Sequence, residues 1–466
     1  MAETEHVEQL RDAWGALRPE YLDDLNAALA TQDAKLARNL TRDLHAADMA
    51  DVLEAMDLDH RVGLITLMGK GFDVEALAEL DAGARDELIE ALPAETVASA
   101  IKKLDTDDAV YLLEDLDRED RAEILSKVSR EDRAVLNRAL EYPEETAGRL
   151  MQTEFVAVPE FWTIGRVVDH VRSARGLPSS FVEIYVTDEG FHLKGALPLS
   201  RLMRTRRDKK VADIMDEEQT VFSVNDPQEE VAYKFEQYNL VSAAVIDTSG
   251  LLVGMLMVDD VLDVIQQRNE EDMLRLGGVA ADEDITGSVV ETTRLRFTWL
   301  FVNLLTAVLA SWVISWFDAT IQQMVSLAVL MPIVASMGGN AGTQTLTVAV
   351  RALATRQLGP FNMVRVVLRE CQVGLINGLL FAIIVGLFVW FWFGFSNLGL
   401  IIGAAMVINL VVAAMAGILL PLVLDHFGVD PAVSSVVFLT TVTDVVGYFS
   451  FLGLAKLFFN LGAGTG

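Results

Sequence analysis

The chain has 466 residues and a formal net charge of −30, which is unevenly distributed along it. Only five of its 67 acidic and seven of its 37 basic residues lie after residue 291, where apolar residues predominate. This composition predicts a large acidic soluble part followed by a membrane part. Such an acidic excess argues against nucleic acid as a partner and favours metal cations. The single cysteine, Cys371, excludes a disulfide framework and a thiolate metal site.

The first region, residues 1–141, carries a short helical repeat. Six apolar residues recur at intervals of 12, and each of the first five is followed by a residue that suits the start of a helix. The apolar positions are Leu80, Leu92, Leu104, Leu116, Val128 and Leu140, and the following residues are Asp81, Pro93, Asp105, Asp117 and Ser129. We therefore expect one short helix and a turn per repeat, stacked into an α-superhelix with one apolar seam.

Residues 142–259 alternate between helix and strand patterns in two similar halves. Each half has a helix and then two strands that flank a tight turn: Ile164–Arg172, Val182–Val186 and Leu193–Leu197, then Gln228–Tyr238, Ala243–Asp247 and Leu252–Met257. Two β-α-β-β-α units of this kind predict an α+β region made by internal duplication. Residues 260–290 follow as a linker, with a helix over roughly Asp260–Leu276 that has one acidic face.

The remaining residues, 291–466, contain five apolar segments long enough to cross a bilayer, which takes about 20 helical residues. They are 295–317, 321–350, 364–393, 397–424 and 433–459. Arginines precede the first segment and surround the loop after the second, so the positive-inside rule places the N-terminus in the cytoplasm. The start of the chain lacks a basic-then-apolar signal peptide, which agrees with this orientation. We expect a multi-pass protein of the cell membrane with an all-α bundle of five helices.

A single acidic residue, Asp444, lies inside the fifth apolar segment. A carboxylate at that depth costs a few kcal/mol on insertion scales, so such groups usually face a partner or a water-filled path. The spacing of Thr440, Thr441, Asp444 and Gly447 puts hydroxyls, carboxylate and a small residue on one helical face. This face predicts a cation path through a helix bundle. The alternative is a carboxylate that is satisfied by a neighbouring helix.

The second apolar segment contains an unusual polar and glycine-rich stretch. Met331-Pro332 is followed by the run Met337-Gly338-Gly339-Asn340-Ala341-Gly342-Thr343-Gln344. Proline and glycine at membrane depth are tolerated where freed carbonyls meet protein or water, and small residues let helices approach closely. Asn340, Gln344 and Thr347 form a polar stripe at helical spacing. The stretch predicts a pore lining, whereas glycines alone would indicate tight helix packing.

Three groups of residues make the chain resemble the MgtE-type magnesium channels and transporters over nearly its full length. They are Pro332…Gly338-Gly339-Asn340-x-Gly342-x-Gln344, Arg369-Glu370-x-x-Val373-Gly374, and Asp430-Pro431…Thr440-Thr441-x-x-Asp444-Val445-x-Gly447. The order of regions is also similar: a helical acidic N domain, two cystathionine-β-synthase (CBS) modules, a linking plug helix and five spans. The resemblance implies a homodimer whose pore runs along the dimer axis between the second and fifth spans. It also implies that the acidic cytoplasmic domains sense Mg²⁺ and close the pore when Mg²⁺ is abundant.

Two sets of candidate metal-binding residues follow. The pore set comprises Asp444, Asn340, Gln344, Thr440, Thr441, Gly338, Gly339 and Gly447, and the sensor set comprises Glu229, Asp260, Asp263, Glu271, Asp272, Asp105 and Asp108. Mg²⁺ usually binds through one or two carboxylates and keeps several waters, so two Asp444 carboxylates at a dimer axis can hold a hydrated ion. The sensor acids repel one another unless a cation bridges them.

The chain departs from the family pattern at positions that affect sensing and nucleotide binding. An acid that relatives carry after a tyrosine in the second CBS module is Asn239 here, so we expect weaker Mg²⁺ sensing. Some relatives bind ATP between the CBS modules through an Arg-Asp pair. Those positions read Ser200-Arg201 here, and Met257 replaces the usual Thr or Ser before Asp260. Nucleotide binding is therefore not expected.

Two other functions are compatible with the same sequence. One is an exchanger that couples movement of the divalent cation to another ion, and the other is a membrane-anchored CBS sensor that conducts nothing. A polar stripe on two spans argues against the anchored sensor, because an anchor needs none. The sequence shows no nucleophile–base pair, phosphate loop or transition-metal cluster, so we do not expect an enzyme.

Overall fold

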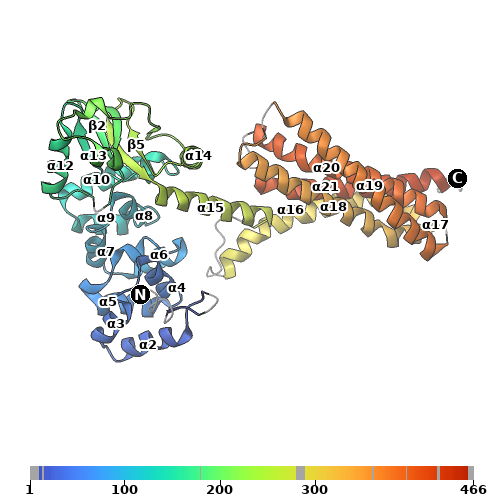
Figure 1. The fold of residues 1–466 in the computed structure, drawn as a ribbon. Coiled ribbons are helices and arrows are strands. Elements are labelled where there is room, and N and C mark those ends of the chain that lie inside the picture. Colours follow the sequence, from blue (N-terminus) through green and yellow to red (C-terminus); the bar gives the residue numbers. More distant parts are fainter. Residues whose placement is uncertain are drawn as a thin grey trace. The chain divides into compact units, whose positions relative to one another are not determined.

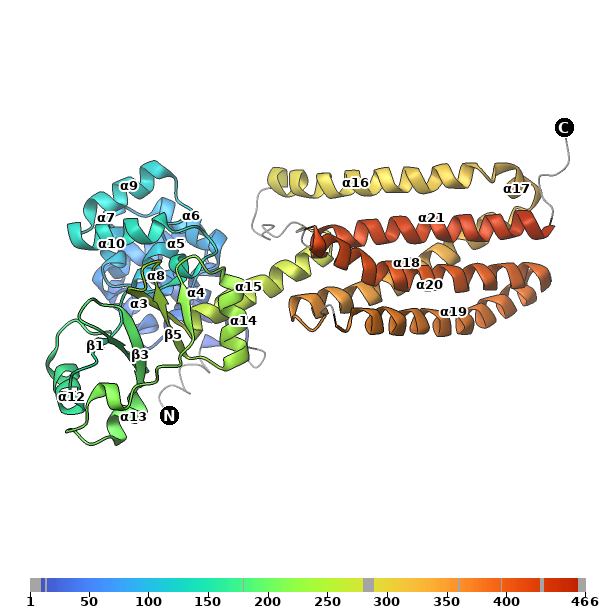
Figure 2. The same ribbon diagram turned by 90° about the horizontal axis from the view of Figure 1, so that it is seen from above.

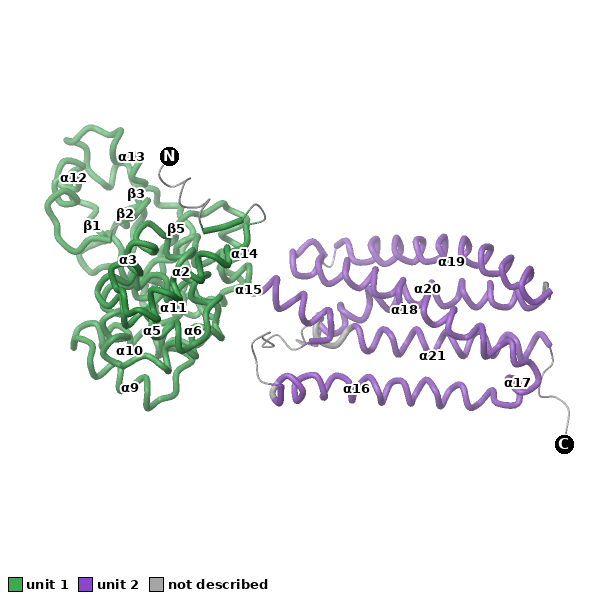
Figure 3. Tube along the Cα trace, turned by 90° about the horizontal axis from the view of Figure 1, so that it is seen from below, with its two compact units in different colours: residues 1–267 green, residues 268–466 purple. Residues whose placement is uncertain are grey.

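The computed structural model describes residues 10–12, 15–178, 180–279, 289–358, 361–394, 396–427 and 431–459. The chain forms two compact units, residues 1–267 and residues 268–466 (Figure 3). The division falls inside one long helix, α15 (Val258–Leu276), which begins in the first unit. This helix corresponds to the expected linker helix over Asp260–Leu276.

The first part of unit 1 is built from helices and short turns (Figure 1). Its elements are α2 (Pro19–Ala30), α3 (Ala34–Thr41), α4 (Ala46–Glu54), α5 (Leu58–Met68), the 3₁₀ turns η1 (Gly69–Gly71) and η2 (Val74–Leu77), α6 (Ala82–Ala91), α7 (Ala94–Ile101), α8 (Thr106–Tyr111), α9 (Arg118–Lys127) and α10 (Arg130–Glu141). The last five helices confirm the 12-residue repeat, because the five expected start residues are their N-caps. All six seam residues lie in or against one apolar core.

A second repeat feature is a set of arginines four residues after an N-cap, namely Arg61, Arg85, Arg121 and Arg133. Arg61 is buried, and its Nε donates to the carbonyls of Leu53 and Met56, both at 2.9 Å. Arg121 and Arg133 likewise donate to carbonyls five residues earlier, at 3.2 and 3.0 Å. These side chains satisfy carbonyls that the end of the preceding helix leaves without a partner. The arginine is therefore part of the joint between successive repeats.

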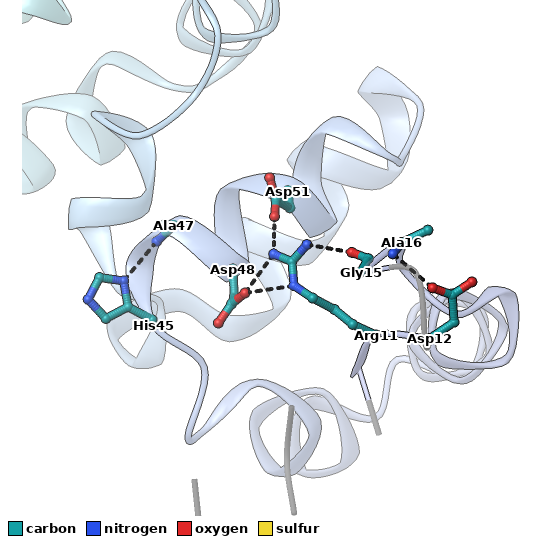
Figure 4. Close-up of polar contacts among 8 residues, drawn as sticks. All are labelled: Arg11, Asp12, Gly15, Ala16, His45, Ala47, Asp48 and Asp51. Atoms are coloured by element: carbon teal, nitrogen blue, oxygen red, sulfur yellow. Dashed lines mark hydrogen bonds and ion pairs between the residues drawn. The ribbon is translucent and has the colours of Figure 1, made fainter. Parts of the chain in front are cut away.

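The described start of the chain is tied to α4 by Arg11. Its guanidinium donates to Asp48 Oδ1 at 2.7 Å and also bonds Asp51, as Figure 4 shows. These two carboxylates raise the pKa of Arg11 above its ordinary value. His45 caps α4 by accepting a bond from the backbone N–H of Ala47 at 3.3 Å. The contact agrees with a capping role rather than metal ligation.

The second part of unit 1 contains two small sheets of equal topology. After α11 (Ala147–Leu150), the first sheet has β1 (Ala157–Pro159), β2 (Glu183–Thr187) and β3 (Leu193–Pro198), with α12 (Ile164–Ser173), α13 (Leu199–Arg204) and the 3₁₀ turn η3 (Val211–Asp213). The second has β4 (Val221–Ser223), β5 (Ser242–Ile246) and β6 (Leu252–Met257), with α14 (Gln228–Tyr238).

In each sheet the first strand pairs parallel with the second, and the second pairs antiparallel with the third. The register shifts at Val186/Thr187 in one sheet and at Val245/Ile246 in the other. The predicted duplication of a β-α-β-β-α unit is confirmed. The sequence pattern gave no residue range for the short first strand of each module. Each of these strands has three residues, too few to show an alternating pattern.

Unit 2 is a bundle of long helices. They are α16 (Val289–Ser315), α18 (Ser326–Ala354), α19 (Met363–Phe393), α20 (Ser396–His426) and α21 (Pro431–Phe459), with the short α17 (Asp318–Gln323) after the first. In Figure 2, α18, α19, α20 and α21 lie side by side, and α16 runs along the α21 side of the bundle. Glycines allow α19 and α20 to touch through their backbones: a Cβ at Gly374 would lie 2.9 Å from the Leu410 carbonyl oxygen.

Among the described residues, four helices are long and apolar enough to cross a membrane: Thr292–Ser315, Met363–Phe393, Asn397–His426 and Val436–Phe459. The expected second span, 321–350, differs from the others. Its predicted start is wrong, because Ile321 lies in α17 and the long helix begins only at Ser326. The helix α18 has the length to span, but its glycines and polar residues lower its mean hydropathy.

Candidate cation path and acidic cluster

One face of α18 is polar and exposed on this chain. It comprises Ser336, Asn340, Thr343, Gln344 and Thr347, whereas the buried side of the same helix is formed by apolar residues, glycines and a single threonine, Thr345. The pattern confirms that the predicted stripe is a single face. Amides and hydroxyls on a bundle helix are poorly suited to lipid, which has no hydrogen-bonding groups. The face therefore requires water or a second protein surface.

The hydroxyl groups of this region donate to their own helices. Thr343 Oγ1 donates to the Gly339 carbonyl at 2.9 Å, and Thr441 Oγ1 donates to the Val437 carbonyl at 2.7 Å. Thr440 makes the same kind of bond, at 3.0 Å. A hydroxyl whose proton is already in a hydrogen bond can still accept a bond from an outside donor, or bind a cation, through its oxygen lone pairs. These groups thus act as acceptors toward whatever faces them.

Asp444 lies on α21, one turn after Thr440 and Thr441, and all three side chains are partly exposed. Within the described part of the chain, no hydrogen bond or ion pair reaches the Asp444 carboxylate. The alternative of a carboxylate satisfied by a neighbouring helix of the same chain finds no support in these residues. Among the described residues, the carboxyl group on the expected face of α21 therefore has no hydrogen-bond or ion-pair partner.

The glycines of the two motifs divide into two groups. Gly338 of α18 and Gly447 of α21 are buried, and a Cβ at either would press against the side chain of Asn409 of α20. In contrast, a Cβ at Gly339 would meet only Thr443 Oγ1, at 4.0 Å. Gly338 and Gly447 thus have a packing function, and the pore role assigned to all three glycines stays a prediction.

Acidic residues from three segments of unit 1 converge at α8 and the start of α15. Burial, followed by repulsion from Asp105, raises the pKa of Asp108 to about 7, and Glu75, Glu79 and Asp259 contribute to the same effect. The pKa of Asp107 is raised well above its ordinary value by burial and by Asp260. The structure thereby brings together the predicted Asp105, Asp108, Asp260 and Asp263, whose pKa values are all raised.

The other predicted sensor residues belong to other segments of the chain. Glu229 is in the first turn of α14, and it is not among the groups that raise the pKa values of the cluster acids. Glu271 and Asp272 lie further along α15, in the second unit, where Glu271 pairs with Arg275 at 3.0 Å. Asn239 ends α14 with φ of 52°, a left-handed C-cap that Asn adopts more readily than an acid-bearing longer side chain.

No group of three or more His, Cys, Asp or Glu side chains within the described ranges has the geometry of a metal site. The acidic cluster nevertheless has the donor chemistry of a hard divalent cation that keeps most of its water. Sequence reasoning missed several members of the two sites: Asp107, Asp259, Glu75, Glu79 and Asn409. Asn409 carries the same signal as Asp444, a polar residue inside an apolar span, but no other polar residue lies at helical spacing from it, so it forms no stripe like that of α18.

A four-part order is thus established: a helical acidic domain, a CBS pair, a long connecting helix and a membrane bundle with a polar face. This is the organisation of a multi-pass membrane transporter. Three family models match parts of the chain: "Divalent cation transporter" (MgtE) at residues 331–454, "MgtE intracellular N domain" at 44–145 and "CBS domain" at 211–267.

Whole-chain relatives have the same name. The protein named magnesium transporter MgtE of Thermus thermophilus is 32% identical over 439 residues, covering 93% of this chain and 97% of the relative. The Bacillus subtilis protein of that name is 27% identical over 438 residues, covering 94% and 97%. The chain therefore belongs to the MgtE family. A solved cytosolic domain of the Mg²⁺ channel MgtE in complex with ATP is 30% identical, with a TM-score of 0.49, and covers 52% of this chain and 99% of that one.

Proposed function

We propose that this protein is a Mg²⁺-selective channel of the cell membrane, with the N-terminus in the cytoplasm. In this proposal two copies form a homodimer, and the pore runs along the dimer axis between α18 and α21 of each copy. The names of the two whole-chain relatives support Mg²⁺ as the transported ion. The proposed pore residues are those expected from the sequence, with Asp444 and Asn340 as the principal ones.

The observation that carries the proposal is the unpaired Asp444 carboxylate beside an exposed polar face. A carboxylate in a membrane span needs a partner, and the described residues of its own chain supply none. In the proposed dimer, the Asp444 carboxylates of the two copies lie at the axis and share one cation as their partner. Their mutual repulsion favours a divalent over a monovalent counter-ion. The oxygen lone pairs of Thr440 and Thr441 can then accept bonds from the waters of a hydrated Mg²⁺.

The acidic cluster of α8 and α15 supports regulation by internal Mg²⁺. The pKa values of these carboxyls are raised, so without a cation the clustered arrangement favours their protonated, neutral form. Mg²⁺ offers the same neutralisation at neutral pH. In the proposed gating, abundant Mg²⁺ stabilises the joined N domain, CBS pair and connecting helix, and this state closes the pore. Glu229, Glu271 and Asp272 belong to this proposal as further sensor acids.

Uptake of Mg²⁺ into liposomes that contain the purified protein tests the pore. Asp444→Asn keeps the size of the side chain and removes the charge, so we expect uptake to fall at least tenfold with dimer and fold intact. Asp425→Asn is the matched control, because Asp425 is an exposed carboxylate at the end of α20. Unchanged uptake in Asp444→Asn would remove this residue from the pathway. A dependence of uptake on the gradient of a second ion would instead support an exchanger.

The dimer axis has its own test. Cys371 is the only cysteine, so Cys371→Ser gives a background in which a new thiol is unique. In that background, Asn340→Cys should cross-link two copies through a short bifunctional maleimide. The exposed, outward Phe391→Cys on α19 should not. Equal cross-linking at both positions would contradict a pore between α18 and α21.

A further inference from the structure

Asn409, in the middle of α20, is completely buried between two other helices. Its Nδ2 donates to the Val334 carbonyl of α18 at 2.8 Å. A Cβ at Gly338 of α18 would overlap this amide, and one at Gly447 of α21 would lie 2.9 Å from Nδ2. The amide thus occupies a space that exists only because two helices each lack a side chain there. It joins three helices, two of which carry the proposed pore residues.

This arrangement is a costly way to hold helices together. Asn409 Oδ1 is buried, and none of the described residues bonds it. An unsatisfied buried acceptor costs about 1–3 kcal/mol, and an apolar side chain of similar size would avoid that cost. Packing stability alone therefore does not explain the amide. A hydrogen bond depends strongly on the angle between donor and acceptor, whereas an apolar contact is non-directional. A hydrogen bond between two helices therefore restricts their rotation and sliding more than an apolar contact does.

We propose that Asn409 is a positioning residue that fixes the rotation and depth of α18 relative to α21. The bond is made at Val334, six residues before Asn340, and the amide rests against Gly447, three residues after Asp444. With this contact, the polar face of α18 and the Asp444 carboxylate are held at one level of the bundle. The inference rests on the proposed pore, because positioning is meaningful only if those groups act on the ion together.

The contact can be tested by a double-mutant cycle between Gly338 and Asn409. Asn409 has a short side chain and no exposed space, so Gly338→Ala can be accommodated only if the amide gives up its Val334 bond. Gly338→Ala should reduce Mg²⁺ uptake per folded protein about tenfold in the wild-type background. In an Asn409→Ala background the same change should cost less than twofold, since the obstructing amide is absent. Equal losses in both backgrounds would show that Gly338 acts independently of Asn409 and overturn the proposal.

A second readout separates positioning from simple stability. Asn409→Leu keeps the volume of the side chain and removes its hydrogen bond. We expect it to keep at least half of the folded yield while the uptake ratio of Mg²⁺ to Ca²⁺ falls fivefold or more. Wild-type selectivity in folded Asn409→Leu would contradict positioning. Gly453→Ala is the control, because a Cβ there meets only Phe317 Cζ at 4.0 Å and should change neither uptake nor selectivity.

The outcome is distinguishable from failure of the pore proposal. The Gly338–Asn409 coupling can also be measured by thermal unfolding of the full chain in detergent, which does not depend on transport. Coupling in unfolding together with wild-type uptake in Asp444→Asn would reject the pore assignment and leave the three-helix contact in place. No coupling in either measurement would reject the contact, whatever the role of Asp444.

Discussion

Asp107 of α8 and Asp260 of α15 share a side-chain hydrogen bond within the acidic cluster. After burial, the charge of Asp260 is the largest cause of the raised pKa of Asp107, whereas the bond from Asp107 offsets part of the rise in the pKa of Asp260 that burial, Asp259 and Asp108 produce. Both are largely withdrawn from water, and Gln152 Nε2 donates to Asp107 at 3.5 Å. Two carboxylates so placed cannot both be charged without a cation. The joint between the N domain and the second CBS module therefore depends on what neutralises this pair, a proton or a metal ion.

The first prediction concerns pH in the absence of divalent cations. The raised pKa values belong to Asp105, Asp107, Asp108, Asp260 and Asp263, and the facing charges are Glu75, Glu79, Glu154 and Asp259. A carboxyl whose folded pKa is raised stabilises the fold at low pH, and this contribution is lost as pH rises through the folded pKa. With Asp108 at about 7, a fragment of residues 1–267 should melt roughly 3–6 °C higher at pH 6 than at pH 8.

Asp188 serves as an internal control, because its pKa is shifted in the opposite direction to those of the cluster acids. Bonds from the backbone of His192 and Gly190, and contacts with the side chains of His192 and Lys194, lower its pKa to about 2. Its contribution is present above its ordinary pKa and is lost only as pH falls toward 2. Asp188→Asn should thus leave the difference between pH 6 and pH 8 unchanged. If the melting temperature does not depend on pH in this window, the cluster acids are not buried together in solution.

The second prediction replaces the proton by an amide. Asp107→Asn removes one charge of the central pair without changing its size, so it mimics the protonated state. We expect the variant fragment to be more stable than wild type at pH 8 without Mg²⁺, and to gain less on adding millimolar Mg²⁺. The measurement is thermal unfolding with and without Mg²⁺. A variant that responds to Mg²⁺ as wild type does would place the metal response away from Asp107.

The third prediction concerns a joint of the helical repeat. The Arg85 side chain is almost fully buried, bonds Asp86 at 2.9 Å and Asp115, and lies 3.8 Å above the ring centre of Tyr111. Arg85→Met removes these bonds while keeping much of the packed length. We expect the free energy of unfolding of residues 1–267 to fall by about 1–3 kcal/mol in urea titrations. The exposed Arg130→Met should change it by less than about 0.5 kcal/mol.

Local signals were sufficient to predict most elements of this fold. The N-caps Asp81, Asp105 and Ser129 mark helix starts because Asp and Ser are preferred at that position, and each directly follows an apolar seam residue. Strands β5 and β6 were found from β-branched and apolar runs around the Ser249-Gly250 turn. The start of α18 was missed because apolar content alone does not distinguish a short helix, such as α17, from the span that follows it.

The candidate sites were only partly predictable, because they depend on contacts between distant segments. Asp444 was found since a charge in an apolar span is conspicuous, whereas Asn409 required the structure, because its role depends on glycines 71 residues earlier and 38 residues later in the chain. In the acidic cluster, the sequence could not tell Asp107 from its many acidic neighbours. Burial selects it, and burial is set by the packing of α8 against α10 and α11 and by the approach of Asp260, not by local pattern.

The fourth prediction concerns the connecting helix. Replacing Asp263, Glu271 and Asp272 together by Ala removes three acids from α15, so internal Mg²⁺ has fewer groups to neutralise. Inhibition of uptake by internal Mg²⁺ should shift to concentrations several times higher, while the ratio of Mg²⁺ to Ca²⁺ uptake stays as in wild type. Because Glu271 pairs with Arg275, Arg275→Ala is the control for loss of that bond alone. An altered selectivity would mean that α15 acts on the pore itself and not through sensing.

The last prediction removes the N domain. Asp107 and Asp108 lie in α8 and Asp105 is its N-cap, so deletion of residues 1–141 takes away one side of the acidic cluster and leaves Asp260 with fewer carboxylates to repel it. Because there is less repulsion between carboxylates, bound Mg²⁺ stabilises the closed state by a smaller free energy, and closure no longer depends on the ion. We expect uptake by the truncated protein at high internal Mg²⁺ to stay near the level that wild type reaches at low internal Mg²⁺. The measurement is uptake into liposomes loaded with no Mg²⁺ and with roughly 1 and 10 mM Mg²⁺, concentrations at which weak carboxylate sites fill.

Asp188→Asn in the full chain controls for loss of a surface charge in the same unit. Inhibition of the truncated protein equal to that of wild type would show that internal Mg²⁺ acts outside the α8–α15 cluster.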